Sequence, residues 1–448
     1  MINLDHLPIE VISLIVNHAN HQELYHCALV NKRFYAATMP ILWRSPKMGN
    51  HTTTPRLTKS LSIARTSLGH FVRRLSFEEA LLDETLIFFI DRTHLLEELV
   101  ITNANSITDK SVQHLAKQCY QLRKLHLGHA DITHRSLHYI GQHCKRIREL
   151  ILHNCHKLLP ITLLPFADCP LEYLDLSGCK WLSVDETVID LIQFDRLTHL
   201  ELVCCSTINV QFIQQLTAMN HHHRPSSPSL IHTNSSYQQQ QQHIPLPLLT
   251  YFAITGNTEI NDDAIIPFVI SHPLLQYVHL LECNITDASI EAIYQHLTDL
   301  LALDISYCER ITARSLRKLI HYCQHVLLIG LQNCFLPAQV FPELDSIFSD
   351  DHLYIQTLGY SDIMAIRLTS IDDGFNEENR EDDDDDEQQQ LQEGNMDDDI
   401  MDYNIDTIRQ DNNNNNIRNN DHFIMENNDD MNEVRAFILS LSEHHFNI

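Results

Sequence analysis

The residues of this chain with the most versatile chemistry are its 12 cysteines and 30 histidines, which can bind metals, form disulfides or act as nucleophiles. The segment LLALDISYCERITARSLRKLIHYC, residues 300–323, carries two cysteines fifteen residues apart. Tetrahedral zinc sites need short, convergent spacings, and the sequence has no C-x-x-C pair. The role of these cysteines therefore depends on the elements that position them.

Those elements repeat along the chain. The pattern L-x-x-L-x-L-x-x-C/N/A-x-x-I/L recurs every 24 to 26 residues, with one gap of 52, and such a period is typical of stacked units. The copies begin at Val72, Leu96, Leu122, Ile147, Leu171, Leu197, Leu249, Leu275, Leu300 and Val326. Each x-L-x-L-x core alternates like a half-buried strand, and helical spacing follows it. The predicted N-caps of these helical segments are Thr108, Thr133, Thr286 and Thr312.

The repeat register accounts for ten of the cysteines. Six occupy one slot, three residues after the last apolar residue of the strand: Cys155, Cys179, Cys205, Cys283, Cys308 and Cys334. Other copies fill this slot with Ala80, Ala104, Ala130 and Asn257. Four more cysteines end the helical half of a repeat: Cys119, Cys144, Cys169 and Cys323. A slot that accepts Cys, Ala or Asn selects a small residue that packs or bonds locally, so we predict structural thiols.

The repeats, about ten copies over residues 71–345, resemble the cysteine-containing class of leucine-rich-repeat proteins. The resemblance implies a curved α/β solenoid with a parallel concave sheet and helices outside. The x residues of each strand would line the concave face, where two basic residues stand against six acids and three tyrosines. We predict that this face recognises a neutral or basic signal in a protein substrate. The candidate substrate-binding residues are Lys124, His126, Glu149, Tyr173, Asp175, His199, Glu201, Tyr251, Tyr277, His279 and Asp304.

A different segment, LDHLPIEVISLIVNHANHQELYHCALVNKRFYAATMPILWR, precedes the repeats over residues 4–44. Its apolar residues have helical spacing in three short runs, and Pro8 stands at the start of the first. The segment resembles an F-box in Leu7, Pro8, Glu10, Ile12, Ile15, the run LVNKRF at 29–34, and Leu42-Trp43. Family members more often carry Cys at the position of Asn31 and Trp at that of Phe34. The alternative is a helical cap that only shields the first repeat.

An F-box followed by leucine-rich repeats is the architecture of substrate receptors of SCF-type ubiquitin ligases. The resemblance implies that the head binds a Skp-type adaptor, and through it cullin and RING subunits, while the repeats bind the target for ubiquitination. The expected adaptor-binding residues form an apolar set suited to docking: Leu7, Pro8, Ile12, Ile15, Leu29 and Val30. The alternative is a ligase-independent interaction scaffold.

We expect a non-catalytic protein with no metal and no cofactor. The sequence has no G-x-x-x-x-G-K-[ST] loop, no G-x-S-x-G turn and no H-E-x-x-H motif. Such an adaptor subunit would act by proximity, because it holds the target close to the ligase and breaks or makes no bond itself.

Composition sets the other boundaries: an F-box over 1–45, a linker over 46–70 and a C-terminal capping segment over 346–371. A Pro-, Ser- and Gln-rich insert at 220–245 interrupts the repeats, and its three histidines at 221–223 lack further ligands for a metal. Residues 372–433 hold 23 acids and three arginines, a net of −20, which predicts a disordered tail. This tail either only solvates the chain or also binds basic partners or screens the repeat face. Residues 434–448 have the pattern of a short amphipathic helix.

The charge and the amino terminus exclude several classes of protein. With 59 acids against 31 lysines and arginines, the net of −28 argues against general nucleic-acid binding. The first residues carry acids and histidines instead of a basic signal peptide, and no apolar run reaches 18 residues. We therefore expect a soluble protein of the cytoplasm, the nucleus or both, with reduced cysteines and no membrane partner.

Overall fold

The computed structural model describes residues 7–46, 53–63, 68–217, 244–255, 258–344 and 354–369, which all belong to one compact unit. The predicted insert, apart from its last two residues, lies outside this described part. So do the predicted tail over 372–433 and the segment 434–448.

The head consists of three helices, as predicted: α1 (Ile9–Val16), α2 (His21–Ala28) and α3 (Lys32–Leu42). Asn20 caps α2 in a capping box with Glu23, and the Asn31 side chain accepts hydrogen bonds from the first turn of α3. Asn31 is thus the N-cap of α3. The head has a small core of its own: Ile12, Val16, Leu24, Phe34 and Ala37.

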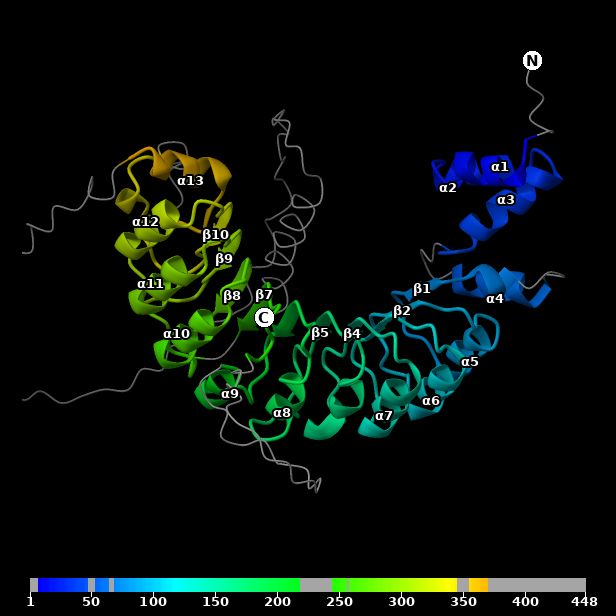
Figure 1. Ribbon diagram of the computed structural model, residues 1–448, viewed down its shortest axis with the longest axis horizontal. Coiled ribbons are helices and arrows are strands. Elements are labelled where there is room, and N and C mark those ends of the chain that lie inside the picture. The colour runs from blue at the N-terminus through cyan, green and yellow to red at the C-terminus, as the bar shows by residue number, and fades with distance from the viewer. Residues whose placement is uncertain are drawn as a thin grey trace, which may run out of the picture. The chain divides into compact units, whose positions relative to one another are not determined.

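The repeats form one continuous sheet (Figure 1) in which ten consecutive strands pair in parallel and in sequence order. The strands are β1 (Arg74–Phe77), β2 (Glu98–Ile101), β3 (Lys124–Leu127), β4 (Glu149–Ile151), β5 (Tyr173–Asp175), β6 (His199–Leu202), β7 (Tyr251–Thr255), β8 (Tyr277–Leu281), β9 (Ala302–Asp304) and β10 (Leu328–Gly330). Strands β6 and β7 pair directly, so the 52-residue gap does not interrupt the sheet. The predicted parallel solenoid is therefore confirmed.

Helical segments follow most strands and lie on the outer side of the sheet (Figure 1). They are α5 (Asp83–Ile90), α6 (Asp109–Gln118), α7 (His134–His143), α8 (Thr187–Leu191), α9 (Val210–Gln215), α10 (Asp262–Ser271), α11 (Asp287–His296) and α12 (Ala313–Tyr322). The repeat after β4 has two 3₁₀ turns instead, η3 (Pro160–Thr162) and η4 (Leu164–Phe166). Pro160 and Pro165 lack the N–H groups that a continuous α-helix needs, which explains the break.

Hydrogen bonds between successive repeats fix the outer segments. Asp109, at the start of α6, accepts from the Thr133 N–H at 2.8 Å and from the hydroxyls of Thr133 and Ser136 in the next repeat. The same arrangement links Asp83 to Thr108 and Ser111, Asp262 to Thr286 and Ser289, and Asp287 to Thr312 and Ser315. The four threonines also cap their helices as predicted. We call this set the Asp–Thr–Ser ladder.

Five of the six slot cysteines bond to the preceding repeat, whereas Cys283 bonds to the Leu281 carbonyl of its own repeat at 3.6 Å. The Sγ of Cys155 donates to the Leu127 carbonyl at 3.1 Å, and Cys179, Cys205, Cys308 and Cys334 donate to the equivalent carbonyls at 3.1 to 3.2 Å. Burial raises the pKa of the Cys155 thiol to about 12, so it is an unreactive thiol at neutral pH. All 12 cysteines are unbridged. The predicted packing role is confirmed for these positions, whereas Ala80 in the first copy is exposed.

Both ends of the solenoid are covered by chain that does not follow the repeat. The stretch predicted as a linker over 46–70 contains α4 (Thr53–Ile63) and the start of η2 (Leu68–Phe71), and Leu57 joins the solenoid core. At the far end, η5 (Ala338–Val340) precedes β11 (Thr357–Leu358), which pairs antiparallel with β10, and α13 (Tyr360–Arg367) follows. The Arg317 guanidinium, 1% exposed, binds both carboxylate oxygens of Glu343 at 2.6 and 3.0 Å.

Candidate partner-binding surfaces

The head exposes a set of large apolar side chains. Ile9, Val11, Leu14, Ile15, Leu29 and Val30 are all exposed, and Leu29 reaches 68%. Three of the predicted adaptor-binding residues, Ile15, Leu29 and Val30, belong to this set. Pro8 is exposed as the N-cap of α1, and Leu7 is partly buried against the head core. Leu14 was missed, although its 64% exposure is one of the largest in the head.

The structure differs from the prediction that Ile12 binds an adaptor, because the Ile12 side chain is fully buried. It packs with Val16, Leu24 and Phe34 in the head core, so it cannot present its side chain to an adaptor in this structure. The apolar spacing of α1 predicts a helix but does not tell which side of it meets the other helices. Tertiary packing decides this, and it places Ile12 inside and Leu14 outside.

At the amino-terminal end of the concave face, charged side chains from neighbouring strands neutralise each other. Arg74 of β1 pairs with Glu98 of β2 at 2.8 Å. Lys124 of β3 pairs with Glu149 of β4, and the two residues are partners in the strand register. Both pairs are partly exposed to solvent, so each contributes little net free energy. We call these four residues the charge ladder.

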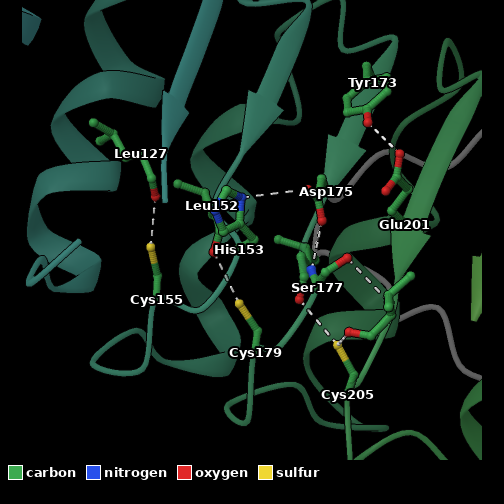
Figure 2. A network of polar contacts seen from close by, with 12 residues as sticks. Leu127, Leu152, His153, Cys155, Tyr173, Asp175, Ser177, Cys179, Glu201 and Cys205 are labelled. Carbon is green, nitrogen blue, oxygen red and sulfur yellow. Dashed lines mark hydrogen bonds and ion pairs between the residues drawn. The ribbon is translucent and has the colours of Figure 1, made fainter. Parts of the chain in front are cut away.

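In the middle of the concave face, β5 and β6 place two carboxylates side by side, because Asp175 and Glu201 are partners in the strand register (Figure 2). The Tyr173 hydroxyl donates to Glu201, and Asp175 accepts from the Ser177 N–H at 2.8 Å. The Nδ1 of His153 lies 3.9 Å from the Asp175 carboxylate. Asp175 and Glu201 are half-buried, as are the neighbouring His153, Tyr173 and Ser177, so solvent still reaches the carboxylate pair.

Burial and neighbouring charge shift the pKa values of Glu201 and of the nearby His153. Burial, and then the charge of Asp175, raise the pKa of Glu201 to about 7, against the hydrogen bond from Tyr173. Burial holds the pKa of His153 below its ordinary value, which outweighs the attraction of Asp175. His153 is therefore mostly neutral at pH 7, and it leaves the charge of Asp175 uncompensated.

His126 lies beside His153, with ring centroids 4.9 Å apart. Burial, followed by repulsion from His153, lowers the pKa of His126 to about 4. Gly128 makes room for this arrangement, since a Cβ at that position would collide with the His153 ring. The two histidines thus form a neutral, partly buried edge between the charge ladder and the carboxylate pair.

A row of aromatic rings crosses β5 to β8 at one register position: Tyr173, His199, Tyr251 and Tyr277. Tyr173 and His199 stack with centroids 5.5 Å apart and planes 27° apart, and His199 and Tyr251 stack at 5.4 Å and 20°. Stacked rings of this kind support flat or cationic ligand groups on their faces and edges. The predicted aromatic anchors are therefore one connected row.

The carboxyl-terminal end of the concave face differs from the expectation of an open surface. Tyr277, His279 and Asp304 are buried, at 3%, 2% and 0% exposure. The Nδ1 of His279 lies 3.8 Å from the Asp304 carboxylate. As placed, these three predicted substrate-binding residues offer little surface to a partner, and the accessible candidates lie on β3 to β7.

A hollow of about 600 Å³ lies on the outer side, where the 3₁₀ turns replace a helix. It is lined by Gln113, His134, Arg135, His138, Tyr139, Ile161 and Pro165. Pro160 and Pro165 belong to the two 3₁₀ turns beside this hollow. Within the described residues, no group of three or more His, Cys, Asp or Glu side chains is arranged to hold a metal ion. No helix in that part of the chain is long and apolar enough to cross a membrane.

Comparison with known proteins supports the identity of the head. A family model described as F-box-like matches residues 4–48. Among solved structures, a chain of the yeast Rad7–Elc1 complex is 19% identical, with 75% of each chain covered and a TM-score of 0.41. A chain from the complex of Latrophilin 3, Unc5D and FLRT2 is 12% identical, with 60% of this chain and 72% of that chain covered and a TM-score of 0.36. Scores this low carry no argument, and the repeat architecture rests on the sheet and ladders described above. The chain thus has an F-box-like head over residues 4–48, followed by a parallel-stranded solenoid whose repeats have the leucine-rich pattern.

Proposed function

We propose that this protein is the substrate-recognition subunit of an SCF-type ubiquitin ligase. In this proposal the head binds a Skp-type adaptor, which links the chain to cullin and RING subunits, and the concave face binds a target protein. The observation that carries the proposal is the F-box-like match over residues 4–48, directly ahead of a leucine-rich-repeat solenoid.

The surface of the head supports an adaptor-binding role. A domain with only five buried core residues exposes Leu14, Ile15, Leu29 and Val30, each at half or more of its surface. Clustered exposure of large apolar side chains is unfavourable in water and is typical of protein-binding sites. A partner that covers them gains apolar burial without any rearrangement of the head core.

The proposed mechanism is proximity. The chain would hold a target on its repeats and the ligase on its head, which raises the local concentration of the ubiquitin carrier near lysines of the target. In this proposal the chain itself is a non-catalytic subunit and supplies geometry alone.

One observation favours the alternative of a capping head in a ligase-independent scaffold. The Arg44 carbonyl accepts from the Arg73 and Arg74 N–H groups at 2.8 and 3.0 Å, as the Arg73 carbonyl does from Glu97 and Glu98 one repeat later. Trp43 also packs against the solenoid core. The end of the head therefore takes the place of a preceding repeat. These capping residues differ from the exposed apolar set, so one head can perform both roles.

Co-purification with a Skp-type adaptor tests the proposal. The head variant carries Leu14→Ser, Ile15→Ser and Leu29→Ser. A matched control carries Leu159→Ser, Ile161→Ser and Leu164→Ser, which removes three apolar side chains exposed at 44%, 51% and 59% on the solenoid. We expect the wild type and the control to retain the adaptor and the head variant to lose it by more than tenfold, with all three folded. An intact chain that does not bind the adaptor would leave only the scaffold role.

A further inference from the structure

The concave face changes character between β4 and β5. On β1 to β4, each cation of the charge ladder is matched by an acid on the neighbouring strand. From β5 to β10, the eighteen x positions of the six strands contain no lysine and no arginine. The same positions contain three acids, Asp175, Glu201 and Asp304, of which the first two are reached by solvent. Among the described strands, the x positions of β5 to β10 therefore place no lysine or arginine beside the carboxylate pair, unlike those of β1 to β4.

The polar contacts of the carboxylate pair do not supply a positive charge. Glu201 receives a neutral phenol hydroxyl, and Asp175 receives a backbone N–H and the edge of a mostly neutral imidazole. Burial is the main reason why the pKa of Glu201 is raised, and repulsion from the neighbouring Asp175 carboxylate raises it further. A cation placed between them would remove this repulsion and form charge-assisted hydrogen bonds.

The surrounding rings determine which cation fits. Tyr173 belongs to the stacked row and also donates to Glu201, so an aromatic ring stands directly beside the carboxylates. Neighbouring parallel strands are about 4.8 Å apart, a separation over which a planar guanidinium can donate to two carboxylates. Arginine combines this forked geometry with weak hydration and stacking on aromatic rings, whereas the lysine ammonium is a compact, strongly hydrated charge.

We propose that Tyr173, Asp175 and Glu201 form a binding site for an arginine side chain of the target protein. The proposal rests on the receptor function proposed above and names the chemistry of its substrate. The arginine would donate to both carboxylates and lie against the Tyr173 ring. The occupant is an arginine-bearing segment of another protein, since charge complementarity favours a basic partner on this face.

The test is selection of a random dodecapeptide display library on the purified full-length chain at pH 8 and 0.15 M salt. The site variant carries Asp175→Asn and Glu201→Gln. The matched control carries Glu78→Gln and Glu98→Gln, which removes the same charge from the same sheet face outside the proposed site. Because all three proteins keep the acidic stretch 372–433, nonspecific attraction of basic peptides to it is equal in each.

We expect the wild type and the control to enrich arginine over the input library and the site variant to lose that enrichment. Equal arginine enrichment by all three proteins would assign the attraction to the acidic stretch and overturn the proposal. A wild type that selects no arginine, or that enriches lysine equally, would overturn it as well.

A selected peptide, labelled with fluorescein, gives the affinity directly. Replacement of its arginine by citrulline, which keeps the shape but removes the charge, should weaken binding to the wild type by about tenfold or more. The same replacement should change binding to the site variant by less than twofold. A citrulline peptide that binds the wild type as tightly as the arginine peptide would contradict the proposal.

The pH dependence of peptide binding distinguishes a role of Glu201 in binding from a role in folding. The pKa of Glu201, about 7, predicts that the arginine peptide binds more weakly at pH 6 than at pH 8, because the carboxylate becomes protonated. With Glu201→Gln alone, this dependence should largely disappear.

A folded-state pKa above the unfolded value means that the Glu201 contribution to stability is present at low pH and lost as pH rises through about 7. Glu201→Gln should therefore match or exceed the wild type in thermal stability at pH 8.

This test is independent of the ligase role. A chain that selects arginine peptides but does not bind a Skp-type adaptor would contradict the proposed function and keep the arginine site. A chain that binds the adaptor but shows no arginine preference would do the reverse.

Discussion

The head and the solenoid bury apolar surface on different scales, and their outer surfaces differ accordingly. The head closes around Ile12, Val16, Leu24, Phe34 and Ala37, and it leaves comparable apolar side chains exposed. In the solenoid each repeat adds to one continuous core, and the accessible concave face presents charges and aromatic rings. A thin core therefore leaves apolar surface for a partner, whereas a continuous core leaves recognition to charge and stacking.

We expect the largest loss of stability from a substitution in the core of the head. Ile12→Ala removes most of a fully buried side chain from a five-residue core, which should cost about 2 to 4 kcal/mol. We expect the head to melt at a lower temperature, with the main transition of the solenoid unchanged, as measured by differential scanning calorimetry. The exposed substitution Leu14→Ala is the control and should shift neither transition measurably. A single transition that moves as a whole would show that Trp43 couples both cores into one cooperative unit.

We expect a smaller loss of stability from a substitution in the Asp–Thr–Ser ladder of the solenoid. Asp109→Asn weakens three hydrogen bonds of the Asp–Thr–Ser ladder and should cost about 1 to 2 kcal/mol in urea unfolding at pH 7. Burial opposes ionisation of Asp109, but hydrogen bonds from Ser136 and Thr133 outweigh it and lower the pKa. A lowered folded-state pKa gives stability that is present above the unfolded value of 3.8 and lost as pH falls below it.

The substitution should therefore remove part of the acid sensitivity of the solenoid as well as part of its stability. Asp168→Asn is the control, because this carboxylate is 84% exposed and pairs with Lys145 at 3.3 Å. If both variants lose the same stability at pH 7, the ladder does not hold successive repeats together.

The smallest effect concerns the charge ladder. Lys124→Gln breaks the ion pair between Lys124 and Glu149, whose side chains are 30% and 40% exposed, respectively. The loss in free energy of unfolding should be less than about 1 kcal/mol. Raising the salt concentration should reduce the difference further, because screening already weakens the pair. A loss well above this value in urea unfolding would mean that the charge ladder supports the fold of the concave face.

Sequence periodicity predicted the solenoid well because the same pattern occurs in every copy of the repeat. The strands begin two residues after the first apolar residue of each copy, and five of the six slot cysteines bond to a carbonyl of the preceding repeat. The helix in the 46–70 stretch and the Asp–Thr–Ser ladder were not predicted. Their partners lie in other segments, and a single-copy pattern does not encode such contacts.

The binding surfaces were less predictable, for a physical reason. The spacing of Ile12, Leu14 and Ile15 fits a helix with either side turned inward, and only the contacts with α2 and α3 settle the choice. On the repeats, alternation placed Asp175 and Asp304 on the same face, yet one is half-buried and the other fully buried. Whether a carboxylate on this face is paired with a cation depends on the neighbouring strand, which lies about 25 residues away in sequence.

The most direct test of the whole account measures both partners on one set of proteins: the wild type, the head variant and the site variant. Each is titrated with a Skp-type adaptor and with the labelled arginine peptide. We predict that the head variant loses only the adaptor, that the site variant loses only the peptide, and that the wild type binds both at once. Loss of both partners in either variant, or competition between them on the wild type, would contradict two independent surfaces on one receptor.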